Sequence, residues 1–431
     1  MEKYINSGIE WIGSIPREWK ICRLKDIGYL YGGLTGKSGS DFDVEEGDKY
    51  ALFIPFTNIF NNDVIDPSLL QKVKVDINEV QNEVKEGDLL FLMSSEDYDG
   101  IGKPSILQSS ISKLYLNSFC KGMRITNPTV LPKYLFYQMS SHFVREQLRL
   151  EAKGFIRINL RQDKLLSCSI FLPPIAEQQR IAEYLDIKCG EIDRLIALQE
   201  QMITQLTDYK QSVITEAVTK GLNPDVRLVP SGIDWIGEIP MNWKVIRGKY
   251  LFSILNGFAF DSNMFTDDKS YMPLIRIRDI NSIKTEAFYT GNYNEEYVVN
   301  KGDILIGMDG DFNVAKWKGE KALLNQRVCK INKFTYSVCS GFIFYILPLL
   351  LKRKNDVTYS TTVKHLSSND VLNFEFIVPT YQESIIIAEY LDAKCSEIDK
   401  LIEMKRQKIE TLKVYKKSVI YEAVTCKAII E

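Results

Sequence analysis

Two stretches of the chain place residues where they could hold a phosphate or a cation. The first, YGGLTGKS at 31–38, is similar to the loop that cradles the phosphates of bound nucleotides. That loop requires a glycine five residues before its second glycine, and this position is Tyr31. We therefore interpret the stretch as a glycine-rich surface turn.

The second stretch, DGDFNVAKWKGE at 309–320, has the oxygen spacing of a calcium loop. Asp309, Asp311, Asn313 and Glu320 occupy positions 1, 3, 5 and 12 of such a loop. Position 6 has to be glycine for the sharp turn, and here it is a valine. Two lysines within the stretch would also repel the ion. We expect no calcium here.

Motifs for catalysis are missing from the sequence. It contains neither G-x-S-x-G nor H-E-x-x-H, and no NPPY-type tetrapeptide of the kind that methylates amino groups. The nearest strings, TNPT at 126–129 and LPPI at 172–175, lack the aromatic residue. The two histidines, His142 and His365, lie far apart, and the eight cysteines include no C-x-x-C pair. We expect no catalytic site, no metal and no cofactor on this chain.

Composition sets the class of protein. The chain has 431 residues, enough for two domains or more, with 45% hydrophobic and 26% charged residues. No apolar run reaches the roughly 20 residues of a membrane span, and the first residues show no secretory signal. Free thiols fit a reducing compartment, so a cytoplasmic location is expected. The net charge of −2 counts mildly against nucleic-acid binding.

The elements that would position any site occur twice. AEYLDIKCGEIDRLI at 182–196 returns as AEYLDAKCSEIDKLI at 388–402, with 12 of 15 positions identical. GIEWIGSIPREWK at 8–20 returns as GIDWIGEIPMNWK at 232–244, with 9 of 13 identical. Each half thus opens with one phrase and closes with the other, while the middles diverge. This pattern indicates duplication of a whole domain and suggests a common frame that carries two different reading surfaces.

The phrase at 182–196 belongs to a long helix predicted over 174–220, and its copy belongs to a second one. Apolar residues seven apart form a heptad seam in both, with a companion row three residues on. The residues expected at a helix-pair interface are Leu185, Ile192, Leu195, Met202, Leu206, Tyr209, Val213, Leu391, Ile398, Leu401, Leu412, Tyr415 and Val419. We expect the two helices to pair antiparallel in a coiled coil, related by a pseudo-twofold axis with one globular domain at each end. Gln199 and Lys405 suit a register-setting pair. The alternative is that each helix packs on its own domain.

The divergent middles predict a mixed α/β fold. Short apolar runs at 50–56, 88–93, 271–277 and 303–308 predict strands, and 131–151 predicts an amphipathic helix. Trp11, Trp19, Trp235 and Trp243 of the opening phrases are expected to fasten each domain's N-terminus onto its core. The predicted parts are a domain at 1–173, a helix at 174–222, a domain at 223–379 and a helix at 380–431.

Several strings resemble one known family. They include WIGSIPREWKICRLKDIG at 11–28, WIGEIPMNWKVIRGKYLF at 235–252, FLPPIAEQQRIAEYLD at 171–186 and IVPTYQESIIIAEYLD at 377–392. With this layout the chain resembles, over nearly its whole length, the specificity (S) subunit of Type I restriction–modification systems. The resemblance implies a non-catalytic DNA-binding subunit, whose two middles are target recognition domains for the halves of an asymmetric, bipartite DNA target. The helices would set the gap between the halves.

The resemblance also implies partners. Two methylation (M) subunits would dock on the chain, and restriction (R) subunits would join the full complex on double-stranded DNA. S-adenosylmethionine, ATP and Mg would then be bound by those partner subunits. We expect no membrane.

Residues that contact DNA are expected among polar and basic side chains in loops, because cations bind phosphates and polar groups read base edges. The candidates in the first domain are Ser95, Lys103, Arg149, Lys153, Arg157, Arg161 and Lys164. Those in the second are Arg276, Arg278, Asp311, Asn313, Lys316, Arg327 and Lys364. For each charge, a solvated surface residue is the alternative.

Two other classes of function stay open. A self-contained DNA methyltransferase or nuclease would transfer methyl groups or cut DNA without a partner, although the chain lacks the motifs for either. A purely structural coiled-coil scaffold would give no sequence-dependent DNA protection when assembled with a methylation subunit.

Overall fold

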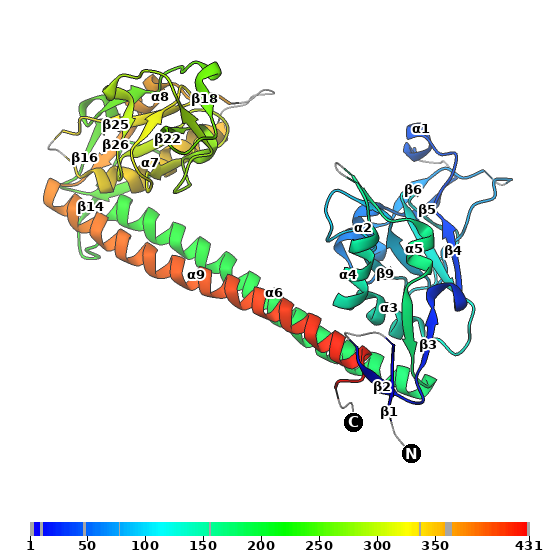
Figure 1. Cartoon of the computed structure of the whole chain (residues 1–431). Helices are drawn as coiled ribbons and strands as arrows, with labels where there is room; N and C mark the ends of the chain where they lie inside the picture. The colour runs from blue at the N-terminus through cyan, green and yellow to red at the C-terminus, as the bar shows by residue number, and fades with distance from the viewer. Residues whose placement is uncertain are drawn as a thin grey trace. The chain divides into compact units, whose positions relative to one another are not determined.

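The computed structural model describes residues 4–8, 12–45, 49–76, 78–154, 157–335, 338–357 and 364–428. The chain forms two compact units, one of residues 1–200 with 407–431 and one of residues 201–406. Each unit contains one α/β domain and parts of the two long helices, α6 (Ile175–Lys220) and α9 (Tyr381–Val424) (Figure 1). The mixed α/β class predicted from the sequence is confirmed.

The first unit is built on a four-stranded antiparallel sheet in the order β4-β11-β7-β9. A second sheet, β10-β5-β6, contains one parallel pair. The strands are β1 (Tyr4–Asn6), β2 (Ser14–Pro16), β3 (Lys20–Arg23), β4 (Gly28–Gly32), β5 (Ala51–Ile54), β6 (Gln71–Val73), β7 (Leu89–Leu92), β8 (Ser94–Ser95), β9 (Pro104–Ile106), β10 (Leu114–Leu116), β11 (Cys120–Ile125), β12 (Ile158–Asn159) and β13 (Ser169–Leu172). The short helices are α1 (Gly39–Phe42), α2 (Phe56–Asn61), α3 (Pro132–Ser140), α4 (His142–Glu151) and α5 (Gln162–Leu166).

The second unit repeats this plan. Its sheet β17-β25-β22-β23 has the same order of equivalent strands, and a five-stranded sheet, β18-β20-β19-β24-β21, again contains one parallel pair. The strands are β14 (Leu228–Pro230), β15 (Glu238–Pro240), β16 (Lys244–Arg247), β17 (Ser253–Asn256), β18 (Phe265–Thr266), β19 (Met272–Ile275), β20 (Ala287–Tyr289), β21 (Val298–Val299), β22 (Ile304–Gly307), β23 (Val314–Lys316), β24 (Ala322–Leu324), β25 (Val328–Asn332) and β26 (Glu375–Val378). The short helices are α7 (Ser340–Val357) and α8 (Ser368–Asn373).

The predicted strands are found where the apolar runs placed them, as β5, β7, β19 and β22. The single helix predicted over 131–151 is wrong, because the structure breaks it into α3 and α4. The break is at Ser141, whose backbone is extended at φ −62° and ψ 144°. Its hydroxyl and its amide both bond to the carbonyl of Gln138 and so end α3 locally.

The repeated tryptophans lie as expected where the structure describes them. Trp19 and Trp243 are buried in the cores of their units, and Trp19 Nε1 donates to Glu177 Oε2 on α6 at 3.2 Å. Trp235 is half-buried beneath the guanidinium of Arg353. Trp11 lies outside the described residues.

The long helices pack against each other antiparallel in each unit. In the first unit, Ile181 and Ala423 line one small cavity, and Lys416 Nζ lies 2.9 Å from Asp193 Oδ2. In the second unit, Lys210 Nζ lies 2.7 Å from Asp399 Oδ1. The two ion pairs are repeat copies of each other, since both lysines and both aspartates are 206 positions apart. Leu412, Val419 and Ala423 of α9 complete the core around α6 in the first unit.

The companion row of the seam differs from the prediction. Leu195, Tyr209, Leu401 and Tyr415, expected three residues on from the first row, are exposed. The buried companions of α9 lie four residues on instead, at Cys395, Ile402, Ile409 and Ala423. A helical period of 3.6 residues allows either spacing, so the packing partner decides between them. The first row is buried at Leu185, Ile192, Leu391, Ile398, Leu412 and Val419 and half-buried at Leu206 and Val213, and Met202 is also half-buried.

Candidate nucleic-acid interface

Three distant segments meet at one edge of the first unit, and we call this place the first junction (residues 93–95, 119 and 157–160). The turn after β7 pairs with the segment before α5, as β8 with β12. The amide of Leu160 donates to the carbonyl of Met93 at 2.9 Å. Lys153 and Asn159 exchange two further backbone hydrogen bonds, so backbone pairing joins these segments.

The second unit contains the same junction (residues 308–310, 327 and 364–366). The amide of Leu366 donates to the carbonyl of Met308 at 2.8 Å, which repeats the bond of Leu160 to Met93. The amide of Gly310 donates to the carbonyl of Lys364, and the amide of Met308 donates to the carbonyl of Arg327, both at 3.0 Å. The scaffold of both junctions is therefore the same, whereas their side chains differ.

Side chains of the first junction combine an aromatic ring with an arginine. The Arg157 guanidinium lies over the exposed ring of Phe119, 5.2 Å from its centroid. A cavity of about 260 Å³ opens beside Arg157, lined by Phe56, Thr57, Phe60, Ser94, Ser95, Glu96 and Asp97. Ser95 is buried, and Lys153 is exposed next to the junction. An exposed ring capped by a cation suits contact with a base and its phosphate.

Side chains of the second junction are charged. Asp309 Oδ1 lies 2.7 Å from His365 Nδ1, and Asp309 Oδ2 lies 3.4 Å from an Arg327 terminal nitrogen. Lys364, half-buried, donates to the carbonyl of Asn355. Asp311 and Asn313 follow on the same loop and are exposed. One carboxylate thus contacts both His365 and Arg327, and the remaining donors of the Arg327 guanidinium face solvent.

Other candidates in the first unit are engaged within the protein. Arg149 donates to the carbonyl of Tyr98 at 3.1 Å and pairs with Asp99 and Glu146, so it holds the loop after β8. Lys103 donates to the carbonyl of Phe60 at 2.6 Å, and burial lowers the pKa of its ammonium group. At α5, Arg161 pairs with Asp163 at 2.9 Å and Lys164 pairs with Glu151 at 2.7 Å.

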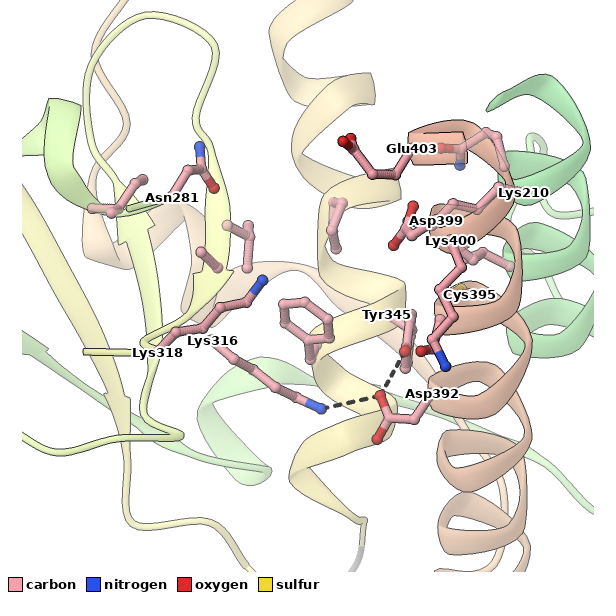
Figure 2. Close-up of a pocket in the computed structure, with 18 of the residues that line it drawn as sticks. Lys210, Asn281, Lys316, Lys318, Tyr345, Asp392, Cys395, Asp399, Lys400 and Glu403 are labelled. Carbon is pink, nitrogen blue, oxygen red and sulfur yellow. Dashed lines mark hydrogen bonds and ion pairs between the residues drawn. The ribbon is translucent and has the colours of Figure 1, made fainter. Parts of the chain in front are cut away.

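Three candidates in the second unit lie away from its junction. Arg276 and Arg278 flank the turn after β19, where both approach Glu286, at 3.0 and 3.8 Å. Lys316 at the end of β23 reaches α9 instead, with its Nζ 3.4 Å from Asp392 Oδ1 (Figure 2). Its ammonium also lies 4.7 Å from the centroid of the Phe344 ring, on the wall of a cleft of about 760 Å³.

The structure thus brings Ser95, Lys153 and Arg157 together in one unit, and Arg327 and Lys364 together in the other. Sequence reasoning missed Phe119 and His365 as site residues. No local sequence pattern identifies either residue. Phe119 lies beside Arg157, and His365 lies beside Asp309, only because strands far apart in the chain pair with each other.

Over the residues that the structure describes, no group of three or more His, Cys, Asp or Glu side chains is placed to hold a metal ion. Within those ranges, no helix combines the length and the apolar character needed to cross a bilayer.

Comparison with known proteins places the fold and the sequence. The model of the family described as Type I restriction modification DNA specificity domain matches residues 16–208 and 240–413. The chain is 39% identical to the Type I restriction enzyme EcoBI specificity subunit of Escherichia coli over 198 residues, 46% of this chain and 42% of that subunit. It is 27% identical to the putative type I restriction enzyme MjaX specificity subunit of Methanocaldococcus jannaschii over 432 residues, 95% of this chain and 93% of that subunit.

Solved structures share the fold. One chain, from work on the structural basis of complex assembly and conformational transition of the type I R-M system, has a TM-score of 0.73 at 15% identity, covering 95% of this chain and 98% of that chain. The HsdS subunit from Thermoanaerobacter tengcongensis has a TM-score of 0.50 at 15% identity, covering 97% and 99%. Because the family model matches most of both halves, the chain belongs to the specificity subunits of Type I restriction–modification systems, which recognise DNA sequence and carry out no catalysis themselves.

Proposed function

We propose that each α/β domain reads one half of an asymmetric, bipartite DNA target. The observation that carries this proposal is the pair of junctions. Equivalent backbone positions carry Ser94 and Asp309, Phe119 and Arg327, and Asn159 and His365. Side chains that differ in charge and shape on one scaffold read different base edges, since sequence is read by side-chain groups in the grooves.

The long helices would set the gap between the two half-sites and dock two methylation subunits. A stiff antiparallel pair keeps its length, and a constant length is what a spacer between two half-sites requires. Methyl transfer from S-adenosylmethionine would belong to the methylation subunits, and ATP- and Mg-dependent cleavage would belong to restriction subunits. The exposed side chains of Leu195, Tyr209, Leu401 and Tyr415 on the helices offer apolar surface for such docking.

The test is to co-express the chain with its methylation subunit in a host without adenine methylation and to map methylated adenines across the genome. The expected result is one interrupted motif with two unequal halves. A continuous or palindromic motif would contradict the bipartite proposal. Methylation without sequence preference would favour a scaffold role instead.

A control addresses the alternative of a self-contained enzyme. The chain without its methylation subunit is incubated with labelled S-adenosylmethionine and DNA. We expect no labelled DNA, since the chain contains no motif for methyl transfer.

A further inference from the structure

We infer that Arg327, which is ion-paired with Asp309, is the residue that selects a guanine in the half-site read by the second domain. This inference rests on the proposed function, because it assigns one base contact to one of the two reading domains. It concerns a single side chain and a single base pair, so it can fail while the proposed function holds.

Backbone hydrogen bonds fix the place in the fold from which the Arg327 side chain extends. It directly precedes β25, and its carbonyl accepts the amide of Met308, the residue after β22. Met308 in turn accepts the amide of Leu366. Three segments separated in sequence are therefore tied together by backbone at the base of this side chain, which gives it a defined starting point.

The Arg327 side chain has an ion-pair partner on one side and is open to solvent on the other. One terminal nitrogen lies 3.4 Å from Asp309 Oδ2, while 58% of the side chain is exposed. Among the described residues, Arg327 has no other side-chain partner. Asp309 is also held by His365 Nδ1 at 2.7 Å, so this carboxylate is anchored before it positions the arginine.

The guanidinium donors of Arg327 that face solvent determine which base this side chain can recognise. An arginine fork can donate two parallel hydrogen bonds, and guanine presents two acceptors, O6 and N7, in the major groove. The other bases do not offer two acceptors in that arrangement. An arginine oriented by a carboxylate therefore favours guanine, whereas a free surface arginine would favour any phosphate.

The first domain supports the assignment by contrast. The position equivalent to Arg327 is Phe119, because Cys120 and Val328 pair with the equivalent residues Leu92 and Gly307. Phe119 carries no donor and instead lies under the guanidinium of Arg157. A change at position 327 should consequently affect one half of the target and leave the other half untouched.

The chain contains a matched control arginine. Arg278 lies in the same domain, is 66% exposed and approaches one carboxylate, that of Glu286, at 3.8 Å. It differs from Arg327 in lying outside the junction. An ordinary surface ion pair contributes little free energy at either position. A difference between the motifs methylated with R327K and with R278K therefore reflects the place of Arg327 in the second junction.

The experiment maps methylated adenines for the co-expressed complex with Arg327→Lys, Arg278→Lys or Asp309→Asn. Lysine keeps the charge but cannot form the fork. For R327K, we expect discrimination for guanine at one base position of one half-site to fall roughly 5- to 150-fold. R278K should leave every base of the motif unchanged, because lysine keeps the charge that a phosphate contact at this position would need. D309N should relax the same base position as R327K, since Asp309 acts through the arginine, and Phe119→Ala should alter only the other half-site.

Two outcomes would overturn the inference. One is an unchanged motif with R327K. The other is a uniform loss of methylation at every site, which would make Arg327 a phosphate contact. Both are read against the wild-type complex in the same host. If the wild-type motif is not bipartite, the proposed function itself fails, and the two failures are thereby separate.

Discussion

The hydroxyl of Tyr137 on α3 donates a hydrogen bond to Asp186 Oδ1 on α6 at 2.7 Å. The second unit repeats this bond, from Tyr345 on α7 to Asp392 Oδ1 on α9 at 2.6 Å. Both tyrosines are buried, and burial followed by the bond to the carboxylate raises the pKa of both phenols. In each unit, the α/β domain is fastened to a long helix by the same pair of residue types.

Removing either hydroxyl should weaken its unit. Tyr137→Phe and Tyr345→Phe should each lower the free energy of unfolding by about 1–2 kcal/mol, because a part-buried hydrogen bond to a charged acceptor is lost. Urea denaturation of the full chain measures the change in the free energy of unfolding. Tyr98→Phe is the control, since that side chain is half-exposed and should give no measurable change. Equal effects of all three variants would contradict the prediction.

The corrected seam of the long helices can be tested with neighbouring residues of α9. Leu412→Ala should lower the free energy of unfolding by about 2–4 kcal/mol, because Leu412 is buried against α6 in the first unit. Tyr415→Ala removes a larger side chain that is 55% exposed and should cost about 0.5 kcal/mol or less. If Tyr415→Ala lowered the free energy of unfolding more than Leu412→Ala, the seam predicted from the sequence, with Tyr415 at the interface, would be favoured.

The ion pair between Lys210 and Asp399 occupies the seam in the second unit. A double-mutant cycle with Lys210→Ala and Asp399→Ala should give a coupling of about 0.5–1 kcal/mol, since both side chains are partly exposed. The swapped chain K210D/D399K should regain part of the stability lost by K210D alone. A coupling free energy of zero would show that this ion pair does not stabilise the pairing of the two helices.

The proposed spacer role predicts a change in gap length. Four residues inserted after Gln199, matched by four after Lys405, lengthen each helix by about 6 Å. At about 3.4 Å per base pair, the gap in the methylated motif should grow by roughly one or two base pairs. Genome-wide mapping of methylated adenines measures the gap, and both half-sites should keep their bases. Altered half-sites with an unchanged gap would refute the spacer role.

Thiol reactivity provides a test that depends on pH. Burial, followed by the charge of Asp26, raises the pKa of Cys22 to about 11 from an ordinary value of 9.0. Because only the thiolate reacts, alkylation of folded Cys22 at pH 8 should be about 100-fold slower than in urea. The rate should rise about tenfold between pH 8 and pH 9. Mass spectrometry of the Cys22 peptide measures both, and a pH-independent rate would contradict the raised pKa.

Local pattern was enough to predict much of this fold. Two near-identical phrases predicted the duplication, and the apolar runs at 50–56 and 303–308 predicted strands that the structure contains. The row of Leu391, Ile398, Leu412 and Val419 predicted one side of the helix seam, and all four are buried. These predictions are correct because each depends only on residues within one segment, where the spacing of apolar residues shows a period of 2 for a strand or 3.6 for a helix.

Long-range pairing produced the rest. The choice between Leu401 and Ile402 as the buried seam residue depends on which face meets the other helix, and a 3.6-residue period permits both. The ring of Phe119 meets Arg157, and the carboxylate of Asp309 meets Arg327 and His365, only because strands distant in the chain align in one register. The amino-acid order thus predicted what kind of protein this is, whereas strand register in three dimensions selected which of its many polar residues come together in the two junctions.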